Sequence, residues 1–189
     1  MTISNEWFKN VTKIIGEENI ISDPILLEPY SHDEYPQKEI AVNPLLVLLP
    51  GNEEEITHIV KECGKYSVPI TVRGGGTGLC GGCVPAQDSI VISLKRMNRV
   101  VASNKSNRTI TVQAGMPLYN LYQEVEALDL FFPPHPGDEG AFIGGAVATT
   151  AGGARAVKYG TVKNFVRGIQ VVLPDGNITQ FGGELVKSS

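Results

Sequence analysis

The sequence predicts an α+β fold made of two small α/β lobes with a cleft between them. From Leu45 onward, apolar runs typical of strands alternate with segments of helical periodicity. Three short β-prone runs follow residue 88, and a Pro-Asp-Gly-Asn turn at 174–177 separates two more runs that are typical of a hairpin. We expect the two lobes to span about residues 45–102 and 109–189.

Residues 1–44 are expected to form an N-terminal helix and an extended connection to the main domain. Apolar side chains recur at helical spacing between Ile3 and Ile15, and Gly16 follows them as a helix stop. Residues 22–43 contain prolines and no apolar period. That composition favours extended chain.

The first lobe begins with a buried strand at residues 45–49. Asn52 is a suitable N-cap for a helix that runs to about Tyr66, and the three glutamates after it complement the positive end of the helix. His58 falls outside the apolar face of this helix, so we expect it at the surface. A second strand at 69–72 then leads into a glycine-rich loop.

The second lobe is predicted from short elements. The β-prone runs at 89–94, 99–102 and 109–113 are separated by polar turns. Pro117 suits the first turn of a helix whose apolar face extends to Leu128. Residues 168–173 and 178–181 complete the prediction as the two strands of a hairpin.

Composition and charge exclude several classes of function. The 189 residues are 42% hydrophobic and 19% charged, which is ordinary for a globular protein. The net charge is −4 and no basic run is present, so a nucleic-acid partner is not expected. The longest apolar run, residues 45–49, is too short to cross a bilayer, and the start lacks the features of a signal peptide. We therefore expect no transmembrane segment.

The cysteines indicate a reducing compartment, and we expect a cytoplasmic protein. An odd count of three gives no disulfide framework. Cys80 and Cys83 have the spacing of a zinc or redox motif, but a second ligand pair is lacking and the intervening glycines resist the helix that a redox motif opens. We interpret the pair as small side chains packed in a tight loop, and no metal site is predicted.

Two glycine-dense segments are the main functional signal. The first is Arg-Gly-Gly-Gly-Thr-Gly at 73–78, followed by two glycines at 81–82, and the second extends from residue 143 to 153. Without a Cβ, backbone amides can come within hydrogen-bonding distance of an oxyanion. The pattern favours a cofactor that carries phosphate.

The surroundings of the first segment exclude two common phosphate loops. A Walker A loop needs Gly-Lys-Ser/Thr, but Leu79 follows Gly78 here and the next lysine is Lys95. A Rossmann loop opens a helix, which Gly81, Gly82 and Pro85 disfavour. What remains is a loop that wraps a diphosphate with consecutive N–H groups.

These residues carry a resemblance to a known family. Residues 72–79 with the glycines at 81–82 resemble the diphosphate loop of the FAD-binding PCMH-type fold of the vanillyl-alcohol oxidase family. The second segment, with Lys-Tyr-Gly at 158–160, is similar to the branch that contains glycolate oxidase, D-lactate dehydrogenase and D-2-hydroxyglutarate dehydrogenase. The resemblance covers about residues 20–189.

The resemblance implies a set of FAD-binding residues. They are Arg73, Gly74, Gly75, Gly76, Thr77, Gly78, Leu79, Pro134, Gly137, Asp138, Ile143, Gly144, Gly145, Thr149, Gly152, Gly153, Tyr159 and Gly160. Residues 74–78 would hold the diphosphate and Arg73 would brace their loop, while the second set would lie beside the ribityl chain and the isoalloxazine. Close helix packing stays open as the alternative reason for the second set's glycines. His135 is either a flavin-facing or an ordinary loop histidine.

Two positions depart from the family pattern. Thr77 stands where relatives that tether FAD covalently use a histidine, so non-covalent FAD is implied. Thr150 stands where the branch commonly has asparagine before Ala-Gly-Gly. We also expect a Gly76→Val substitution to abolish FAD binding and to leave the fold largely intact.

The implied activity is oxidation of a D-2-hydroxy acid, of glycolate or D-lactate type, to the 2-oxo acid. The branch keeps its substrate base, arginine and metal ligands in a C-terminal cap domain, which the chain lacks, so no catalytic residue is assigned and this part alone is expected to be inactive. An electron-acceptor protein is a further expected partner. Two alternatives stay open: an FAD-binding electron-transfer module or partner subunit without a substrate site, and a protein that has lost flavin and binds another phosphate ligand.

Overall fold

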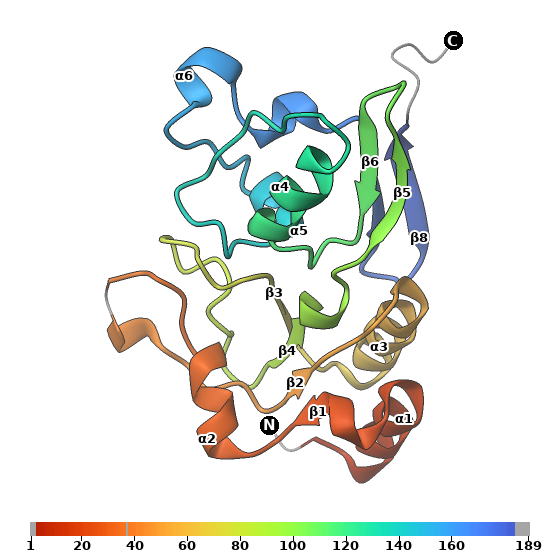
Figure 1. Cartoon of the computed structure of the whole chain (residues 1–189). Coiled ribbons are helices and arrows are strands. Elements are labelled where there is room, and N and C mark those ends of the chain that lie inside the picture. The colour runs from red at the N-terminus through yellow and green to blue at the C-terminus, as the bar shows by residue number, and fades with distance from the viewer. Residues whose placement is uncertain (1–2, 37, 184–189) are drawn as a thin grey trace. The chain divides into compact units, whose positions relative to one another are not determined.

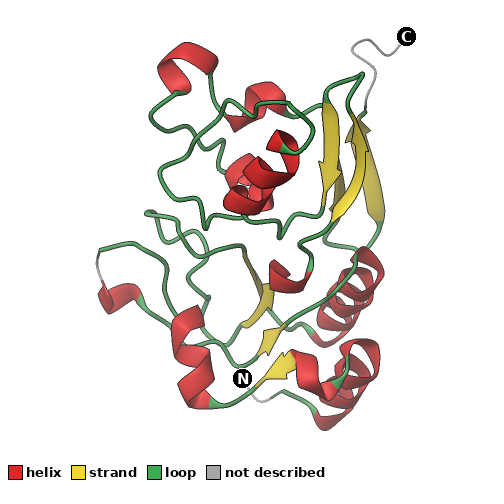
Figure 2. Cartoon of the chain, in the orientation of Figure 1, coloured by secondary structure: helices red, strands yellow, loops and turns green. Residues whose placement is uncertain are grey.

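A four-stranded sheet of order β1-β2-β4-β3 forms the centre of the first of two units into which the chain divides (Figure 1). The structure is a computed structural model that describes residues 3–36 and 38–183. The first unit contains residues up to Arg96 together with Val172–Thr179, and the second contains Met97–Val171 together with the residues from Gln180 on. Helices and strands mix in both, as the predicted α+β class requires (Figure 2).

The sheet of the first unit is mostly parallel. β4 (Ile90–Ser93) lies between β2 (Val47–Leu48) and β3 (Ile70–Arg73) and is parallel to both, while β1 (Ile20–Ile21) is antiparallel to β2. Every residue of β4 is buried, as expected for a central strand. β3 is an edge strand. The strands predicted near residues 45–49, 69–72 and 89–94 are thus confirmed.

Two helices predicted in this unit are also confirmed. α1 (Asn5–Ile15) ends at Gly16, whose φ of +81° suits glycine. α3 (Glu53–Tyr66) begins at Asn52, whose side chain accepts the amide of Glu55 at 2.9 Å. His58 is exposed, as predicted.

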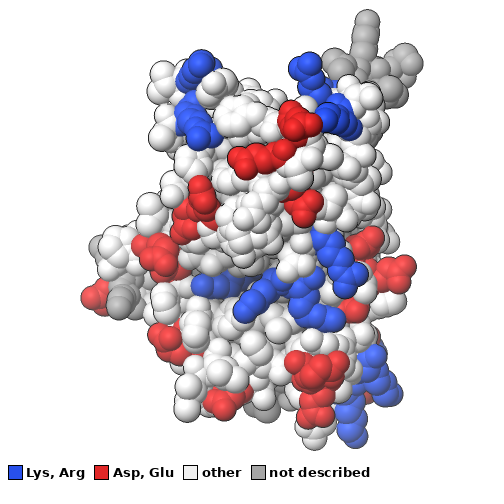
Figure 3. Space-filling view, viewed as in Figure 1, with Lys and Arg blue, Asp and Glu red and all other residues white. Residues whose placement is uncertain are grey.

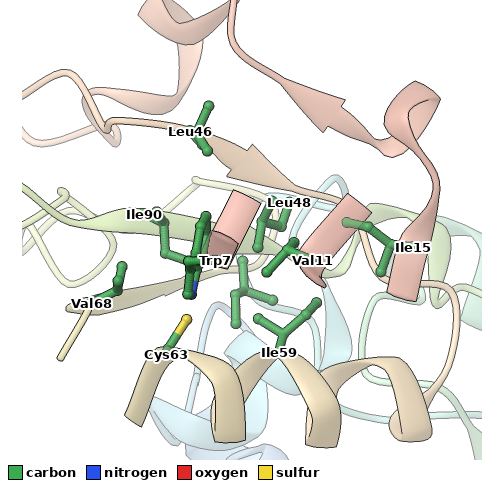
Figure 4. Packing of buried hydrophobic residues seen from close by; sticks show 10 residues of the cluster. Trp7, Val11, Ile15, Leu46, Leu48, Ile59, Cys63, Val68 and Ile90 are labelled. Atoms are coloured by element: carbon green, nitrogen blue, oxygen red, sulfur yellow. The ribbon is translucent and has the colours of Figure 1, made fainter. Parts of the chain in front are cut away.

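Side chains alternate between the two faces of the sheet and build its core. Ile90 and Ile92 of β4 pack with residues of α1 and α3, and Figure 4 shows Trp7 and Cys63 from these helices meeting there. Val91 points to the opposite face. There it packs with Val47 and with Leu27 of α2 (Pro24–Leu27).

Residues 22–43 differ from the extended connection that their composition favours. They contain α2 and the 3₁₀ turns η2 (Glu28–Tyr30) and η3 (Lys38–Ile40), and η1 (Glu17–Asn19) precedes them. Asp23 caps α2 by accepting the amide of Ile25 at 2.8 Å, and Pro24 takes the first helical position. Local capping therefore produces helical turns where no apolar period predicts them.

The second unit is built on short elements. β5 (Val100–Asn104) and β6 (Thr109–Val112) form an antiparallel hairpin that packs with α4 (Leu118–Glu126). The segments that follow are α5 (Ile143–Ala148), α6 (Ala156–Tyr159) and η5 (Val162–Phe165). The strands predicted at residues 99–102 and 109–113 and the helix after Pro117 are confirmed. The one predicted hairpin, at residues 168–181, is confirmed by the pairing of the two strands there.

The chain ends its described part with β7 (Gly168–Val172) and β8 (Ile178–Gly182), which pair in a two-stranded sheet. Gly176 occupies the turn between them with φ of +77°. The 3₁₀ turn η4 (Leu94–Arg96) follows β4. None of the helices among the described residues is long and apolar enough to span a membrane.

Charged side chains of both signs are interspersed on the face of the molecule shown in Figure 3. The net charge of the chain is −4. Sustained binding of a nucleic-acid backbone needs a basic stripe. This charge balance gives no support for such a partner.

Candidate cofactor site

The first glycine loop begins where β3 ends. Arg73 is the last residue of β3, and the chain from residue 74 to residue 89 forms neither helix nor strand. The expectation that no helix opens after Gly78 is therefore confirmed. Any anion bound here would meet loop amides rather than a helix N-terminus.

The side chain of Arg73 turns back and ties the loop to an earlier segment. The guanidinium is buried and donates to the carbonyl oxygens of His32 at 2.6 Å and Pro29 at 3.0 Å. It also lies over the ring of Tyr30, 5.6 Å from the centroid. Arg73 thus braces the base of the loop, because its donors are taken by protein carbonyls.

Gly76 and Gly78 differ in backbone conformation and in the space that a Cβ would have. Gly76 has φ of +79°, and a Cβ there would collide with the Arg73 guanidinium. Gly78 has no such φ, and its Cβ would stand 3.5 Å from Oδ2 of Asp33, in ordinary contact. The positive φ and the crowded Cβ position of Gly76 argue against the expectation that Gly76→Val leaves the fold largely intact, since the substitution would displace the residue that braces the loop.

The amides of this loop are available for a ligand. Within the described residues, no backbone N–H from residue 74 to residue 82 donates a hydrogen bond, whereas the amide of Val84 donates to the Gly81 carbonyl oxygen at 3.1 Å and that of Ala86 to the Thr71 hydroxyl at 3.3 Å. Consecutive free amides around a residue of positive φ form an anion-binding concavity. The donor set fits a diphosphate.

The segment before the loop contains a residue that sequence reasoning missed. Asp33 is 5% exposed, its Oδ1 accepts the amide of Tyr35 at 3.0 Å, and its Oδ2 has no hydrogen-bond partner among the described residues. The amide of the next residue, Glu34, donates to the carbonyl oxygen of Gly78 at 2.9 Å. No spacing pattern links residues 33 and 78, so only the fold brings them together.

The two loop cysteines have unequal environments. Cys83 is half-buried and its Sγ accepts from Nη1 of Arg73 at 3.4 Å. Burial raises the pKa of the Cys83 thiol, while the Arg73 charge opposes that shift. Cys80 is exposed. The interpretation of both as packed side chains is therefore wrong for Cys80.

The second glycine segment lies in the second unit and begins as a helix. The amides of Ile143 and Gly144 donate to the carbonyl oxygens of Met116 at 2.8 Å and Ala114 at 2.9 Å. A Cβ on Gly144 would stand 2.7 Å from the Cβ of Ala114. Close packing, the alternative left open for this segment, therefore explains Gly144, and two amides at the start of α5 are already satisfied.

The later part of this segment is fixed against residues 134–136. Gly153 has φ of +114°, and a Cβ there would collide with the carbonyl oxygen of His135. Thr150 has φ of +54°, a left-handed conformation that a β-branched residue rarely adopts. Asparagine tolerates that conformation better, which gives a physical reason for its use by the family at this position.

A cavity of about 140 Å³ lies beside His135 in the same unit. The hydroxyl of Tyr122 donates to the carbonyl oxygen of Pro134 at 3.1 Å and lies 3.3 Å from Nδ1 of His135, and Glu139 lies 3.8 Å from that nitrogen. Burial, helped by the Glu139 carboxylate, raises the pKa of Tyr122. The lining residues are Tyr122, Glu126, Phe131, Phe132, His135, Glu139 and Arg155.

The remaining predicted residues of the second unit are exposed or partly exposed, except for Pro134, which is buried. Gly137 and Asp138 are exposed, and Asp138 accepts the amide of Gly140 at 2.7 Å. Tyr159 is 36% exposed and its ring meets Phe131 edge to face at 6.1 Å. Thr149 is exposed, and its hydroxyl donates to the carbonyl oxygen of Gly145 at 2.9 Å. Residues 73–79 thus form one set in the first unit, and the others lie in the second.

Sequence comparison finds a matching family model and several relatives. The family model described as FAD binding domain matches residues 44–182. The chain is 42% identical over 185 residues to a D-lactate dehydrogenase of Archaeoglobus fulgidus, covering 97% of the chain and 40% of that protein. It is 36% identical over 186 residues to the glycolate oxidase subunit GlcD of Bacillus subtilis, covering 98% of the chain and 39% of the relative.

Solved structures share the fold. An alkyldihydroxyacetonephosphate synthase superposes with a TM-score of 0.85 at 21% identity, over 96% of this chain and 38% of that one. At this identity the likeness concerns the fold alone. The chain spans about two fifths of the length of the curated relatives it matches.

Proposed function

The chain belongs to the FAD binding domain family, and from that premise we propose that it is the FAD-binding portion of a flavin-dependent oxidoreductase acting on a D-2-hydroxy acid. FAD is the cofactor of the family. The substrate would be of the glycolate or D-lactate type, as the names of the relatives suggest, and the product would be the 2-oxo acid.

One observation carries the proposal: the amides of residues 74–82 donate to no acceptor in the described part of the chain. We propose that residues 74–78 bind the diphosphate through these amides, with Arg73 holding the loop and Leu79 beside it. A methyl or larger side chain in such a cradle would keep phosphate oxygens away from the N–H groups. The positive φ of Gly76 supports a concave arrangement.

In the second unit we propose flavin contacts for the residues that the resemblance assigns. They are Pro134, Gly137, Asp138, Ile143, Gly144, Gly145, Thr149, Gly152, Gly153, Tyr159 and Gly160. The exposure of Gly145 and Thr149 supports contact with a ligand. Ile143 and Gly144 would contribute surface rather than amides, because their N–H groups are taken by Met116 and Ala114.

The chemistry of electron acceptance belongs to the bound cofactor. This chain's residues would bind and orient it. Non-covalent attachment is proposed because Thr77 offers no imidazole for a covalent link. We propose no catalytic residue here: a C-terminal cap domain would bind the hydroxy acid and supply the base.

We further propose that residues 45–189 form an FAD-binding domain in a cytoplasmic protein that passes electrons to an acceptor protein. Free Cys63, Cys80 and Cys83 support a reducing compartment. A second candidate function is an electron-transfer module or partner subunit without its own substrate site.

Two measurements test the proposal. The purified chain is mixed with FAD, passed through a desalting column and examined by visible absorption. Flavin bands are expected to remain, and Gly78→Val is expected to lose them while the matched substitution Gly64→Ala, at an open position on α3, keeps them. Absence of flavin from the wild-type chain at saturating FAD would contradict the proposal.

The second measurement separates the two candidate functions. A longer protein that contains this chain is assayed with D-lactate and with glycolate, using a dye as electron acceptor. Turnover by the longer protein, and none by the chain alone, is the expected result. Flavin reduction only by a partner protein would favour the electron-transfer module.

A further inference from the structure

The carboxylate of Asp33 is buried against the first glycine loop with half of its hydrogen-bonding capacity unused. Its side chain is 95% buried, given the 5% exposure, and Oδ1 accepts the amide of Tyr35. Oδ2 has no partner among the described residues, and it lies 3.5 Å from the point where a Cβ of Gly78 would stand. A buried acceptor without a donor destabilises the state that contains it.

The end of the loop nearest to Asp33 contains a backbone amide without an acceptor among the described residues. The amide of Gly78 donates to no described residue, and the amide of Glu34 donates to the carbonyl oxygen of Gly78 at 2.9 Å. Rotation of the peptide between Thr77 and Gly78 is the motion that would bring that N–H toward Oδ2. Among the described residues, an acceptor without a donor thus lies close to the residue whose amide has no acceptor.

We propose that Asp33 is a positioning residue of the diphosphate loop: in the cofactor-bound state its Oδ2 accepts the Gly78 amide and fixes the loop's last peptide. The amides of residues 74–77 then remain for the phosphate oxygens. This inference rests on the proposed binding of FAD by the loop, and it refines the role of Gly78 within it.

If Asp33 positions the loop, its removal weakens FAD binding, whereas its charge alone predicts that removal strengthens FAD binding. A carboxylate near a diphosphate repels it, so a neutral residue at 33 would bind FAD more tightly if the side chain had no role in holding the loop. A hydrogen bond from an amide to a carboxylate is among the stronger ones in proteins. The sign of the change in affinity therefore distinguishes positioning from bulk electrostatics.

The test compares Asp33→Asn with Glu34→Gln in the 189-residue chain. Asparagine keeps the shape and an oxygen for the Tyr35 amide, but it places an NH₂ group where Oδ2 faces Gly78. Glu34→Gln removes the same charge from the adjacent exposed residue. For each variant, the thermal midpoint without FAD and the Kd for FAD by flavin fluorescence are measured.

Asp33→Asn is expected to raise the Kd for FAD about tenfold or more. Its midpoint without FAD is expected to be unchanged or higher, because a buried unpaired carboxylate is removed. Glu34→Gln is expected to bind FAD as tightly as wild type, or more tightly. In ¹⁵N NMR spectra the Gly78 amide proton should move downfield on FAD addition in the wild type and not in Asp33→Asn.

Equal or tighter FAD binding by Asp33→Asn would overturn the inference and leave the proposed function intact. A midpoint without FAD that falls in step with affinity would also overturn it, since the residue would then be merely structural. Failure of the wild-type chain to bind FAD would remove the proposed function, and the inference with it.

Discussion

The Arg73 guanidinium occupies the space into which a side chain at Gly76 would project. The same guanidinium holds the carbonyl oxygens of Pro29 and His32. One glycine therefore permits the turn of the loop and also leaves room for the residue that braces it. The loop's shape and its anchoring are thereby coupled, and substitutions at the two positions should behave alike.

Gly76→Ala is expected to lower the free energy of unfolding by roughly 1–2 kcal/mol or more, because alanine at φ +79° is strained and its Cβ displaces Arg73. Gly78→Ala is the matched control, since its Cβ would meet only ordinary contact. It should stay within about 1 kcal/mol of wild type. Urea unfolding of both variants measures the difference, and equal losses would refute this account of Gly76.

Arg73→Gln is expected to lower the free energy of unfolding by on the order of 3 kcal/mol, because it leaves two carbonyl oxygens without a charged donor. Arg96→Gln serves as the comparison. Arg96 also donates to a carbonyl oxygen, that of Leu49 at 2.7 Å, but its side chain is 39% exposed and water can replace it. In denaturant unfolding, Arg73→Gln should lower the free energy of unfolding more than Arg96→Gln does. The reverse order would show that the brace contributes little.

Thr150→Asn is expected to stabilise the protein by about 1 kcal/mol, since asparagine adopts φ +54° more easily than a β-branched residue. Thr149→Asn is the control: Thr149 has φ of −93° and its hydroxyl donates to Gly145. That variant should gain nothing. Thermal unfolding of the two variants decides, and a gain at 149 but not at 150 would contradict the backbone argument.

The three cysteines are expected to react with a thiol reagent at about pH 8 in a fixed order. Exposed Cys80 reacts first and half-buried Cys83 more slowly. Burial raises the pKa of the Cys63 thiol to about 12, so Cys63 stays protonated and reacts only when the chain unfolds. The order is measured from the time course of chromophore release by the reagent, and Cys80→Ser, as control, should lack the fastest phase. Rapid labelling of Cys63 in the folded protein would disprove it.

The sequence predicted the elements that carry a clear period or cap. Asn52 predicts the start of α3, and the apolar run at 45–49 predicts β2. These elements are predictable because an element that buries one face must place its apolar residues at a regular spacing in the sequence. The α+β architecture was predictable from the sequence for the same reason. The family was predictable because each glycine segment is a continuous stretch of the sequence.

Contacts between residues far apart in the chain could not be predicted, because no pattern in the sequence marks them. Arg73 meets His32 across 41 residues and Pro29 across 44, through backbone carbonyls that every residue possesses. The unpaired Oδ2 of Asp33 likewise depends on what surrounds it in space. α5 was not predicted because Gly144 and Gly145 weaken a helix locally, and its first turn is held instead by the carbonyls of residues 114 and 116.

Amide hydrogen exchange of residues 74–78, with and without FAD, tests most directly whether this loop binds the cofactor's diphosphate. These amides have no acceptor within residues 3–36 and 38–183, so they should exchange fast in the free chain and become protected when FAD is added, while amides of α1 stay unchanged. If FAD binds and exchange at 74–78 stays as fast as before, the diphosphate lies elsewhere and the central claim is wrong.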